Sequence, residues 1–404
     1  MTIDLEALYT DLHEHPELSF QETRTAAIGA GHLRDLGLEV TEGVGGTGVV
    51  GVLRNGDGRT VWLRADMDGL PVEELTGLPY ASRARGLNPQ GTDVPVMHAC
   101  GHDMHVAAMI GAIEQLVTTR DEWSGTIVVV MQPAEEFGAG ARAMIADGVL
   151  TRFPRPDIVL GQHVTPLPTG VVGVRPGTQM AASDGLTITL YGRGGHGSRP
   201  HATVDPIVMA AATIMRLQGI VSREIDPREM AVVTVGSIHA GLKHNIIPAE
   251  ARLELSLRYA HDESRTRVLE KVERVVRAEA AASDAPLPPT IETDHTLPPT
   301  INDPDATARL TAAFDREIGA GTVLDPGMFT GSEDVSWFAR EAGVPLVFWF
   351  WGGVDPAVYM RAQAEGAIER DIPTNHSPFF APLLQPTLRN GVQTLTVAAR
   401  EFLA

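Results

Sequence analysis

The 404-residue sequence contains one cysteine, no long apolar run and no excess of positive charge. The single cysteine, Cys100, excludes an intramolecular disulfide, so it is a free thiol, a buried apolar residue or a metal ligand. No apolar run approaches the roughly 18 residues that a membrane span needs. The first 20 residues also lack the basic end and apolar block of a secretory signal. We therefore expect a cytoplasmic protein with no membrane partner.

Acidic residues dominate the charge of the chain. Lysine and arginine total 32 against 51 aspartates and glutamates, so the formal net charge is -19. A field of this sign repels nucleic acid, and no basic run offsets it. We expect no nucleic-acid partner, and an anionic substrate would need a local arginine. Apolar residues make up 43% and mean hydropathy is -0.01, which suits a globular protein with a sizeable core and room for two domains.

Short apolar runs indicate an α/β fold. Residues 126–131, 157–163 and 344–351 are continuously apolar enough to be strands buried on both faces of a sheet. From Gly101 the apolar residues recur with helical spacing. We predict a mixed, mainly parallel sheet with helices on both faces. Ser19–Glu22 also reads as a capping box that opens a helix.

A second pattern occupies the middle of the chain. Residues about 184–295 follow the order strand, helix, strand, strand, helix, strand, which is that of a ferredoxin-like α+β unit. The unit is inserted into the larger domain. The predicted domains are therefore 1–183 with 296–404, and 184–295.

Polar residues stand where predicted buried strands end. Asp66 and Asp68 follow one strand, Glu135 and Glu136 follow a second, and His163 follows a third. Ligand sites in parallel sheets lie beyond the carboxyl ends of the strands. Cys100 and His102, at the start of a helix, could join them. A thiolate with imidazoles and carboxylates suits a borderline divalent ion, zinc first, with cobalt, manganese or nickel as alternatives.

Eight motifs carry a resemblance to a known family. They occur in order between residues 13 and 380: "HEHPELSFQE", "LRADMDGLPVEE", "MHACGHDMHVA", "QPAEE", "GRGGHGSRPHATVDPIV", "NIIP", "GSEDVSWF" and "NHSPFF". Together they resemble the amidohydrolase branch of the M20 metallopeptidase family, which includes bacterial aminoacylases, hippurate hydrolases and auxin-conjugate hydrolases. The resemblance implies a zinc-exopeptidase-like fold with a lid and dimerisation domain, here residues 184–295.

The resemblance also implies roles for individual residues. Two divalent cations would be bridged by the cysteine, and Glu135 would be the general base. In the lid, His196 would reach the active site of a neighbouring subunit in a homodimer, while Asn245 and Arg258 would hold substrate. The implied metal ligands are Cys100, His102, Glu136, His163 and His376.

Among members of this branch, "GGHGSRPH" followed by "DPIV" looks most like aminoacylases. The implied reaction cleaves an N-acyl amino acid, a small-molecule substrate, to a carboxylic acid and a free amino acid. A metallo-dipeptidase or carboxypeptidase of the same family is the nearest alternative, and a catalytically inactive metal-binding protein is one from another class. Residues 83–96 are longer than the connection in most relatives, so relatives do not fix the substrate preference. The residues also leave open whether Asp66 or Asp68 orients a ligand histidine.

Overall fold

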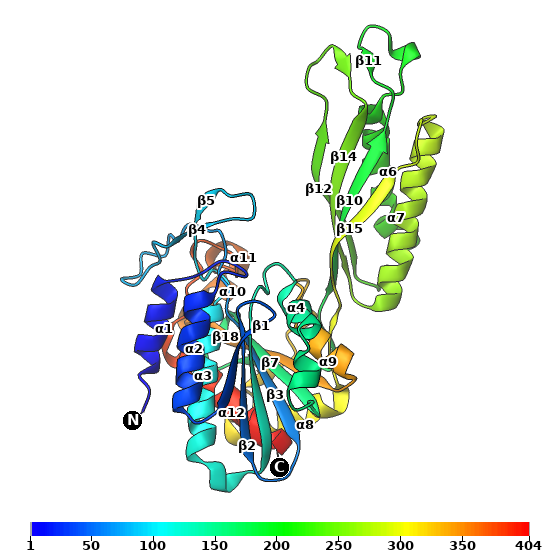
Figure 1. The fold of residues 1–404 in the computed structure, drawn as a ribbon. Helices are drawn as coiled ribbons and strands as arrows, with labels where there is room; N and C mark the ends of the chain where they lie inside the picture. The colour runs from blue at the N-terminus through cyan, green and yellow to red at the C-terminus, as the bar shows by residue number, and fades with distance from the viewer. Residues whose placement is uncertain (1, 404) are drawn as a thin grey trace. The chain divides into compact units, whose positions relative to one another are not determined.

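The computed structural model describes residues 2–403, which fold into two compact units (Figure 1). The first unit contains the chain up to Gln179, Ile301–Gly327 and the chain from Asp334 on. The second contains Met180–Thr300 and Met328–Glu333. The predicted boundaries at 184 and 295 lie within this second unit, a few residues from its ends. Its role as a lid and dimerisation domain stays a prediction.

The first unit is built on an eight-stranded sheet in the order β1-β2-β6-β3-β7-β18-β8-β17. Strand β6 pairs parallel with β3, β3 with β7, and β7 with β18, while β1, β2 and β6 pair antiparallel. The three predicted apolar runs lie in β6, β7 and β18, and the mainly parallel sheet is confirmed. The strands are β1 (Glu39–Val44), β2 (Gly48–Asn55), β3 (Thr60–Asp66), β6 (Gly125–Gln132), β7 (Ile158–Pro168), β8 (Val172–Gly173), β17 (Val323–Leu324) and β18 (Leu346–Val354).

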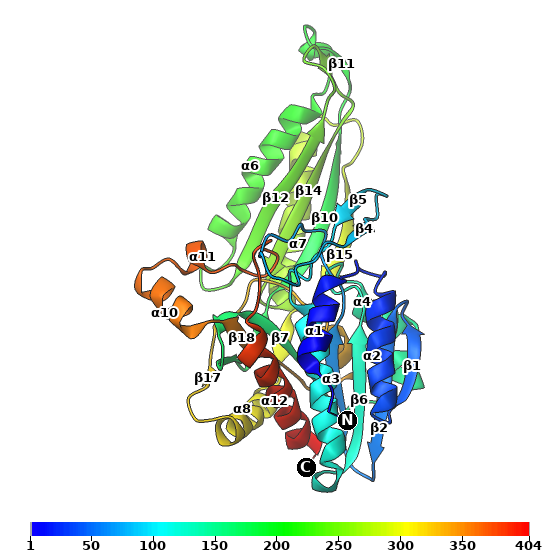
Figure 2. The same cartoon turned by 90° about the vertical axis from the view of Figure 1, so that its left-hand side faces the viewer.

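Helices cover both faces of this sheet, as predicted (Figure 2). Successive residues of β3 are apolar and point to opposite faces of the sheet, so both faces need a cover. Leu63 joins the main apolar core on one face, and Trp62 packs against Phe338 on the other, with ring centroids 6.0 Å apart. On the Leu63 face lie α1 (Leu5–Glu14), α2 (Thr23–Asp35), α3 (His102–Thr118), α8 (Pro304–Glu317) and α12 (Leu384–Leu403). On the Trp62 face lie α4 (Gly140–Ala146) and α9 (Ser336–Ala342).

Shorter elements connect these layers. Residues 83–96, the longer connection, form an antiparallel pair of strands in which Arg85 and Asp93 make an ion pair. Within residues 2–403, no helix combines the length and apolar character that crossing a bilayer requires. The remaining elements are β4 (Arg85–Leu87), β5 (Asp93–Pro95), β9 (Gly177–Met180), β16 (Thr300–Asn302), α5 (Val149–Arg152), α10 (Pro356–Ala364), α11 (Ile368–Asp371), and the 3₁₀ turns at Arg120–Glu122 and Pro200–Ala202.

The second unit has the predicted ferredoxin-like order. Its antiparallel sheet runs β12-β14-β10-β15, and α6 and α7 pack together on the sheet over a separate apolar core (Figure 1). Asp205 caps α6 by accepting a hydrogen bond from the Ile207 N–H, 2.9 Å away, and Pro206 fills the first helical position. The elements are β10 (Ala182–Tyr191), β11 (Gly195–His196), α6 (Pro206–Glu224), β12 (Ala231–Ala240), β13 (Ile246–Ile247), β14 (Glu250–Tyr259), α7 (Asp262–Ala282) and β15 (Thr290–Leu297).

The capping-box interpretation of Ser19–Glu22 is wrong. Helix α2 begins at Thr23, and Glu22 makes no side-chain cap bond to it. The Ser19 hydroxyl instead donates to Asp68, with Oγ and Oδ2 2.6 Å apart. A short hydroxyl–carboxylate pattern matches a local cap in sequence, but here Ser19 bonds to Asp68 and Glu22 accepts from Ala134, residues that only the fold brings near.

Candidate metal centre

Three neighbouring strands deliver carboxylates and an imidazole to one edge of the central sheet. Asp66 is the last residue of β3, and Glu135 and Glu136 follow the end of β6. His163 was predicted to follow its strand but is the sixth residue of β7, which continues to Pro168. Because β6, β3 and β7 are adjacent, these side chains belong to a single edge of the sheet.

A glycine turn places the cysteine beside these groups. Gly101 adopts the left-handed conformation, with φ of 82°, directly before α3 begins at His102. A Cβ at this position would lie 2.4 Å from Val164 Cγ1, so only glycine fits. The turn therefore holds Cys100 and His102 close to β7.

All five predicted ligands lie together. Donor atoms of Cys100, His102 and Glu136 lie within 4.8 Å of one another. Cys100 Sγ is 3.4 Å from His163 Nε2, and His376 Nε2 is 3.3 Å from Glu136 Oε1. Ligand atoms bound at about 2.0–2.3 Å to one tetrahedral zinc ion lie roughly 3.3–3.8 Å apart. The Cys100–His163 and His376–Glu136 separations have this size.

Two atoms of the cluster have the surroundings expected of metal ligands. His102 Nε2 and Glu136 Oε1 are both buried, lie 3.9 Å apart and form no hydrogen bond among residues 2–403; their other charged neighbours are Asp66 Oδ2, 3.4 Å from His102 Nε2, and His376 Nε2, 3.3 Å from Glu136 Oε1. Buried polar atoms without a partner are costly, so such a pair fits a cation between them. Thiol, imidazole and carboxylate donors together suit a divalent ion. The residues present thus fit the two-metal centre that the sequence predicts.

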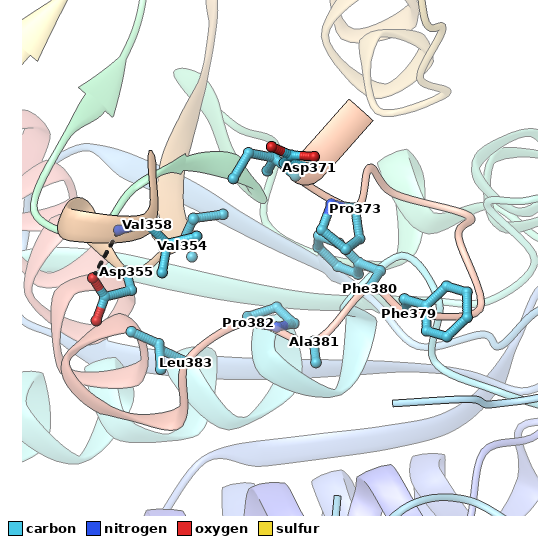
Figure 3. A pocket seen from close by; sticks show the side chains of 12 residues that line it. Val354, Asp355, Val358, Asp371, Pro373, Phe379, Phe380, Ala381, Pro382 and Leu383 are labelled. Carbon is cyan, nitrogen blue, oxygen red and sulfur yellow. Dashed lines mark hydrogen bonds between the residues drawn. The ribbon is translucent and has the colours of Figure 1, made fainter. Parts of the chain in front are cut away.

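Hydrogen bonds join the loop that contains His376, near the C-terminal end of the chain, to the turn that contains Cys100. The His376 N–H donates to the Ala99 carbonyl at 2.8 Å, and Asn375 Nδ2 donates to the Cys100 carbonyl at 3.3 Å. An apolar pocket of about 200 Å³ lies beside this loop, and Phe379 and Phe380 line it (Figure 3). Phe380 also packs near Gly101, so its ring is a wall shared by the pocket and the cysteine turn.

Burial sets the protonation of the donors. Burial raises the pKa of the Cys100 thiol well above its usual value, and the nearby Glu136 and Glu135 raise it further. Burial alone would lower the pKa of His102, but Asp66 and Asp68 outweigh it and raise that pKa to about 10. Burial holds the pKa of His163 well below its ordinary value. A cation in the cluster would therefore be needed to stabilise the thiolate.

The two aspartates make different contacts with the histidines, although Asp66 Oδ2 also lies 3.4 Å from His102 Nε2. Asp68 Oδ1 lies 3.2 Å from His102 Nδ1, so Asp68 orients the predicted ligand. Asp66 pairs with His105 Nδ1, and His105 Nε2 accepts the Val164 N–H at 3.0 Å. This answers the question that the sequence left open, because a carboxylate behind a ligand histidine fixes its ring and tautomer.

Asp68 is also the centre of a wider network. Its oxygens accept the backbone N–H groups of Glu135 at 3.2 Å and Glu136 at 3.1 Å, besides the Ser19 hydroxyl. Glu135, the predicted base, is 8% exposed. Sequence reasoning missed Ser19, and its only signal was the motif "HEHPELSFQE", which contains it.

The predicted lid residues fall into two groups. His196 in β11 pairs with Ile246 in β13, and the Gly197 N–H donates to the Asn245 carbonyl at 2.9 Å, so His196 and Asn245 are neighbours. The His196 side chain is exposed, and its Nδ1 accepts from the Ser198 N–H at 3.1 Å. This group lies just beyond the end of the sheet where Tyr191 pairs with Glu250.

Arg258 lies at the opposite end of the same sheet. Its register partner is Ser183, whose hydroxyl accepts from the Arg258 guanidinium. Arg258 lies eight positions after Glu250 on β14, so the distance between them along the extended strand is roughly 26 Å. One small molecule cannot touch both His196 and Arg258 of the same chain. Among residues 2–403, no carboxylate forms an ion pair with Arg258, so this half-buried cation is free to bind an anion.

Comparison with known proteins identifies the family. Peptidase family M20/M25/M40 matches residues 62–375. A thermostable carboxypeptidase of Saccharolobus solfataricus is 39% identical over 369 residues, which cover 89% of each chain. A hippurate hydrolase of Campylobacter jejuni is 40% identical over 305 residues, 75% of this chain and 76% of the relative.

A solved structure agrees with the sequence relatives. The Bacillus subtilis YxeP protein, described as a dinuclear metal binding peptidase of the M20 family, has a TM-score of 0.78 and 30% identity. The similarity covers 99% of this chain and 97% of that one. The chain therefore belongs to peptidase family M20/M25/M40 and is a hydrolase of its amidohydrolase branch.

Proposed function

We propose that this protein hydrolyses the amide bond of N-acyl amino acids and releases a carboxylic acid and a free amino acid. The observation that carries the proposal is the convergence of five donor side chains beside a buried glutamate, Glu135. In the proposal these donors, Cys100 among them, would hold two divalent cations. The proposed ligands are Cys100, His102, Glu136, His163 and His376.

Zinc is the proposed metal. A cysteine and three histidines are softer donors than the oxygen sets that magnesium and calcium prefer. Zinc accepts sulfur, nitrogen and carboxylate oxygen in one site, and cobalt, manganese and nickel accept similar sets. Bound cations of this kind make a water molecule more acidic and polarise a substrate carbonyl.

Glu135 is the proposed general base. Its neighbour Glu136 faces His102 and His376, and Glu135, buried beside it, is proposed to exchange the proton. Glu135 would take a proton from the attacking water and return it to the leaving nitrogen. Asp68 supports both steps, because it holds the backbone N–H groups of the two glutamates and the ring of His102.

Arg258 is the proposed clamp for the carboxylate of the amino acid. A guanidinium binds a carboxylate through two parallel hydrogen bonds. Arg258 has only a hydroxyl and a carbonyl oxygen as acceptors in the described chain, and a chain with net charge -19 needs such a cation to hold an anion. His196 would bind the substrate carbonyl oxygen, and Asn245 would hold substrate beside it.

The proposed assembly is a homodimer through the second unit, and the separation of these residues supports it. His196 and Asn245 cannot share a substrate with Arg258 of their own chain, so we propose that they act in the partner's site. The edge strand β12 and helix α6 support such an interface, because Val208 is 66% and Met215 73% exposed, and Val232 and Ile238 of β12 are also exposed.

The carboxypeptidase relative supports one alternative, a metallo-dipeptidase or carboxypeptidase that uses the same centre. Bond chemistry does not separate the two, but substrates do. The metal content of purified protein would be measured first, and each metal would then be restored. Turnover would be compared on N-acetyl, long-acyl and benzoyl amino acids and on dipeptides. Faster dipeptide cleavage would reject the aminoacylase, and no turnover of any amide would favour an inactive metal-binding protein.

A further inference from the structure

Glu22 is a buried carboxylate that is not among the proposed metal ligands. Its Oε1 accepts the Phe20 N–H at 2.9 Å and the Ala134 N–H at 2.8 Å. Its Oε2 accepts a short hydrogen bond from the Thr47 hydroxyl. Glu22 is fully buried, and it accepts hydrogen bonds from two backbone N–H groups and a hydroxyl rather than pairing with a cation. These bonds join α2's start to the turn that follows β6.

Both backbone partners of Glu22 have an unusual conformation. Phe20 has φ of 61° and Ala134 has φ of 50°, in the left-handed region that side chains with a Cβ rarely adopt. Only four non-glycine residues between 2 and 403 have positive φ, and two of them donate to this single oxygen. Such conformations persist where surrounding bonds hold them. Glu22 supplies those bonds.

The residues next to Phe20 and Ala134 along the chain form hydrogen bonds with Asp68. Ser19 precedes Phe20 and donates its hydroxyl to Asp68 Oδ2 at 2.6 Å. Glu135 and Glu136 follow Ala134 and donate their N–H groups to the two Asp68 oxygens. Three successive N–H groups, from 134 to 136, are therefore held between two carboxylates.

We propose that Glu22 is a positioning residue that fixes the turn from Ala134 to Glu136, and with it the carboxylates of Glu135 and Glu136. The proposal rests on the roles given to these glutamates above. Displacement of a catalytic base by about 1 Å can lower the rate of the reaction roughly 100-fold, even in a protein that still folds and binds its substrate. Glu22 would therefore act on turnover through Glu135 without touching substrate.

Two substitutions separate the geometry of Glu22 from its charge. Burial raises the pKa of Glu22 to about 7, so the side chain is partly neutral near neutral pH. Glu22→Gln keeps an oxygen for the two N–H groups and presents its amide nitrogen to Thr47. Glu22→Leu keeps a similar volume but leaves both N–H groups without an acceptor.

Glu17 offers a matched control from the same motif. Its Oε1 accepts the Arg24 N–H and its Oε2 the Thr25 N–H, both at 2.9 Å, so it binds two backbone groups of α2 and none of the 134–136 turn. With metal in excess, Glu22→Leu is expected to lower kcat about 10- to 100-fold and to change KM less than about threefold. Glu22→Gln and Glu17→Leu are expected to retain kcat within about threefold.

A second measurement does not depend on activity. Hydrogen–deuterium exchange of the peptide that contains residues 134–140 should become faster in Glu22→Leu and stay slow in Glu22→Gln and Glu17→Leu. If the wild-type protein cleaves no amide, the proposed function fails, and exchange alone decides the role of Glu22. The inference is overturned if exchange is unchanged in Glu22→Leu. It is also overturned if kcat per folded, metal-loaded molecule is unchanged, or if Glu17→Leu shows the same losses.

Discussion

At the residue scale, adjacent side chains have different surroundings and so different proposed tasks. Glu135 and Glu136 share the backbone anchor Asp68, yet Glu136 Oε1 lies 3.3 Å from His376 Nε2 and 3.9 Å from His102 Nε2. A carboxylate between two ligand histidines is suited to hold a cation. The proposal assigns the proton transfer to its neighbour, Glu135.

Glu135→Gln should therefore keep its metal and lose turnover. The amide occupies the same space but cannot accept a proton, and removing a general base commonly costs roughly 100- to 10,000-fold in rate. Metal content by mass spectrometry and kcat on an N-acyl amino acid would be measured together. Glu136→Gln is the control, because it should lower metal content as well. Full activity in Glu135→Gln would assign the base elsewhere.

A buried histidine outside the donor set should affect stability with pH. His13 Nδ1 lies 2.6 Å from Asp103 Oδ2, and His13 Nε2 lies 3.2 Å from Glu74 Oε1. Burial alone would lower the pKa of His13, but the two carboxylates outweigh it and raise the pKa from 6.5 to about 10. Because the folded-state pKa is raised, the stabilisation is complete below about pH 6.5 and is lost as pH rises through about 10.

His13→Gln should accordingly lower the free energy of unfolding at pH 6 by about 3 kcal/mol, because it leaves two buried carboxylates without their cation. The difference from wild type should shrink as pH approaches 10. Urea denaturation across this range would measure it. His15→Gln is the control, since His15 is half exposed beside Asp11. A difference that does not vary with pH would contradict the charged state of His13.

At the element scale, the site depends on where strands and helices stop. Glu136 follows β6, His163 lies within β7, and Cys100 and His102 lie at the start of α3, so elements with apolar interiors fix these four donors. The junction before α3 is tightly packed, because Gly101 lies against Val164 of β7. A side chain there would separate the cysteine turn from the strand that carries His163.

Gly101→Ala should lower stability by roughly 1–3 kcal/mol and should lower metal content, because it adds a clash to a left-handed conformation. Gly37→Ala is the matched control. Gly37 has φ of 85° with nothing within 4 Å of an added Cβ, so it carries the strain without the clash. We expect Gly37→Ala to keep its metal. Equal metal content in both variants would show that the turn does not position Cys100.

At the scale of the whole molecule, the proposed active site needs two chains. His196 lies beyond one end of the ten-residue β10–β14 strand pair and Arg258 lies near its other end, which is too far for a common substrate. If His196 serves the partner's site, two differently inactivated chains can complement each other. Dimer formation would then be part of catalysis and not only of stability.

Mixing Glu135→Gln with His196→Ala should restore activity that neither variant has alone. In the mixed dimer, one site would receive an intact Glu135 and an intact His196. Turnover would be measured after the two proteins are unfolded and refolded together, with separately refolded proteins as the control. Activity equal to the sum of the separate variants would place His196 in its own chain's site or outside catalysis.

Much of the fold could be predicted because its signals are local. Apolar runs identified β6, β7 and β18, and Asp205-Pro206 marked the start of α6. Ser19 and Glu22 could not be predicted, because their partners Asp68 and Ala134 are distant in sequence. The same local pattern served as evidence for a helix cap that the structure does not contain.

The sequence by itself determined the types of donor and the elements that carry them, because side-chain chemistry and apolar periodicity are properties of the chain. Tertiary structure decided which donors meet. Strand β6 lies between β2 and β3, although β2 and β3 are consecutive in sequence, and this order brings Glu135 beside Asp68. Asn375 reaches the Cys100 carbonyl across 275 positions and sets His376 beside Glu136. Strand order and long-range loop contacts come from packing the whole core, which no local segment encodes.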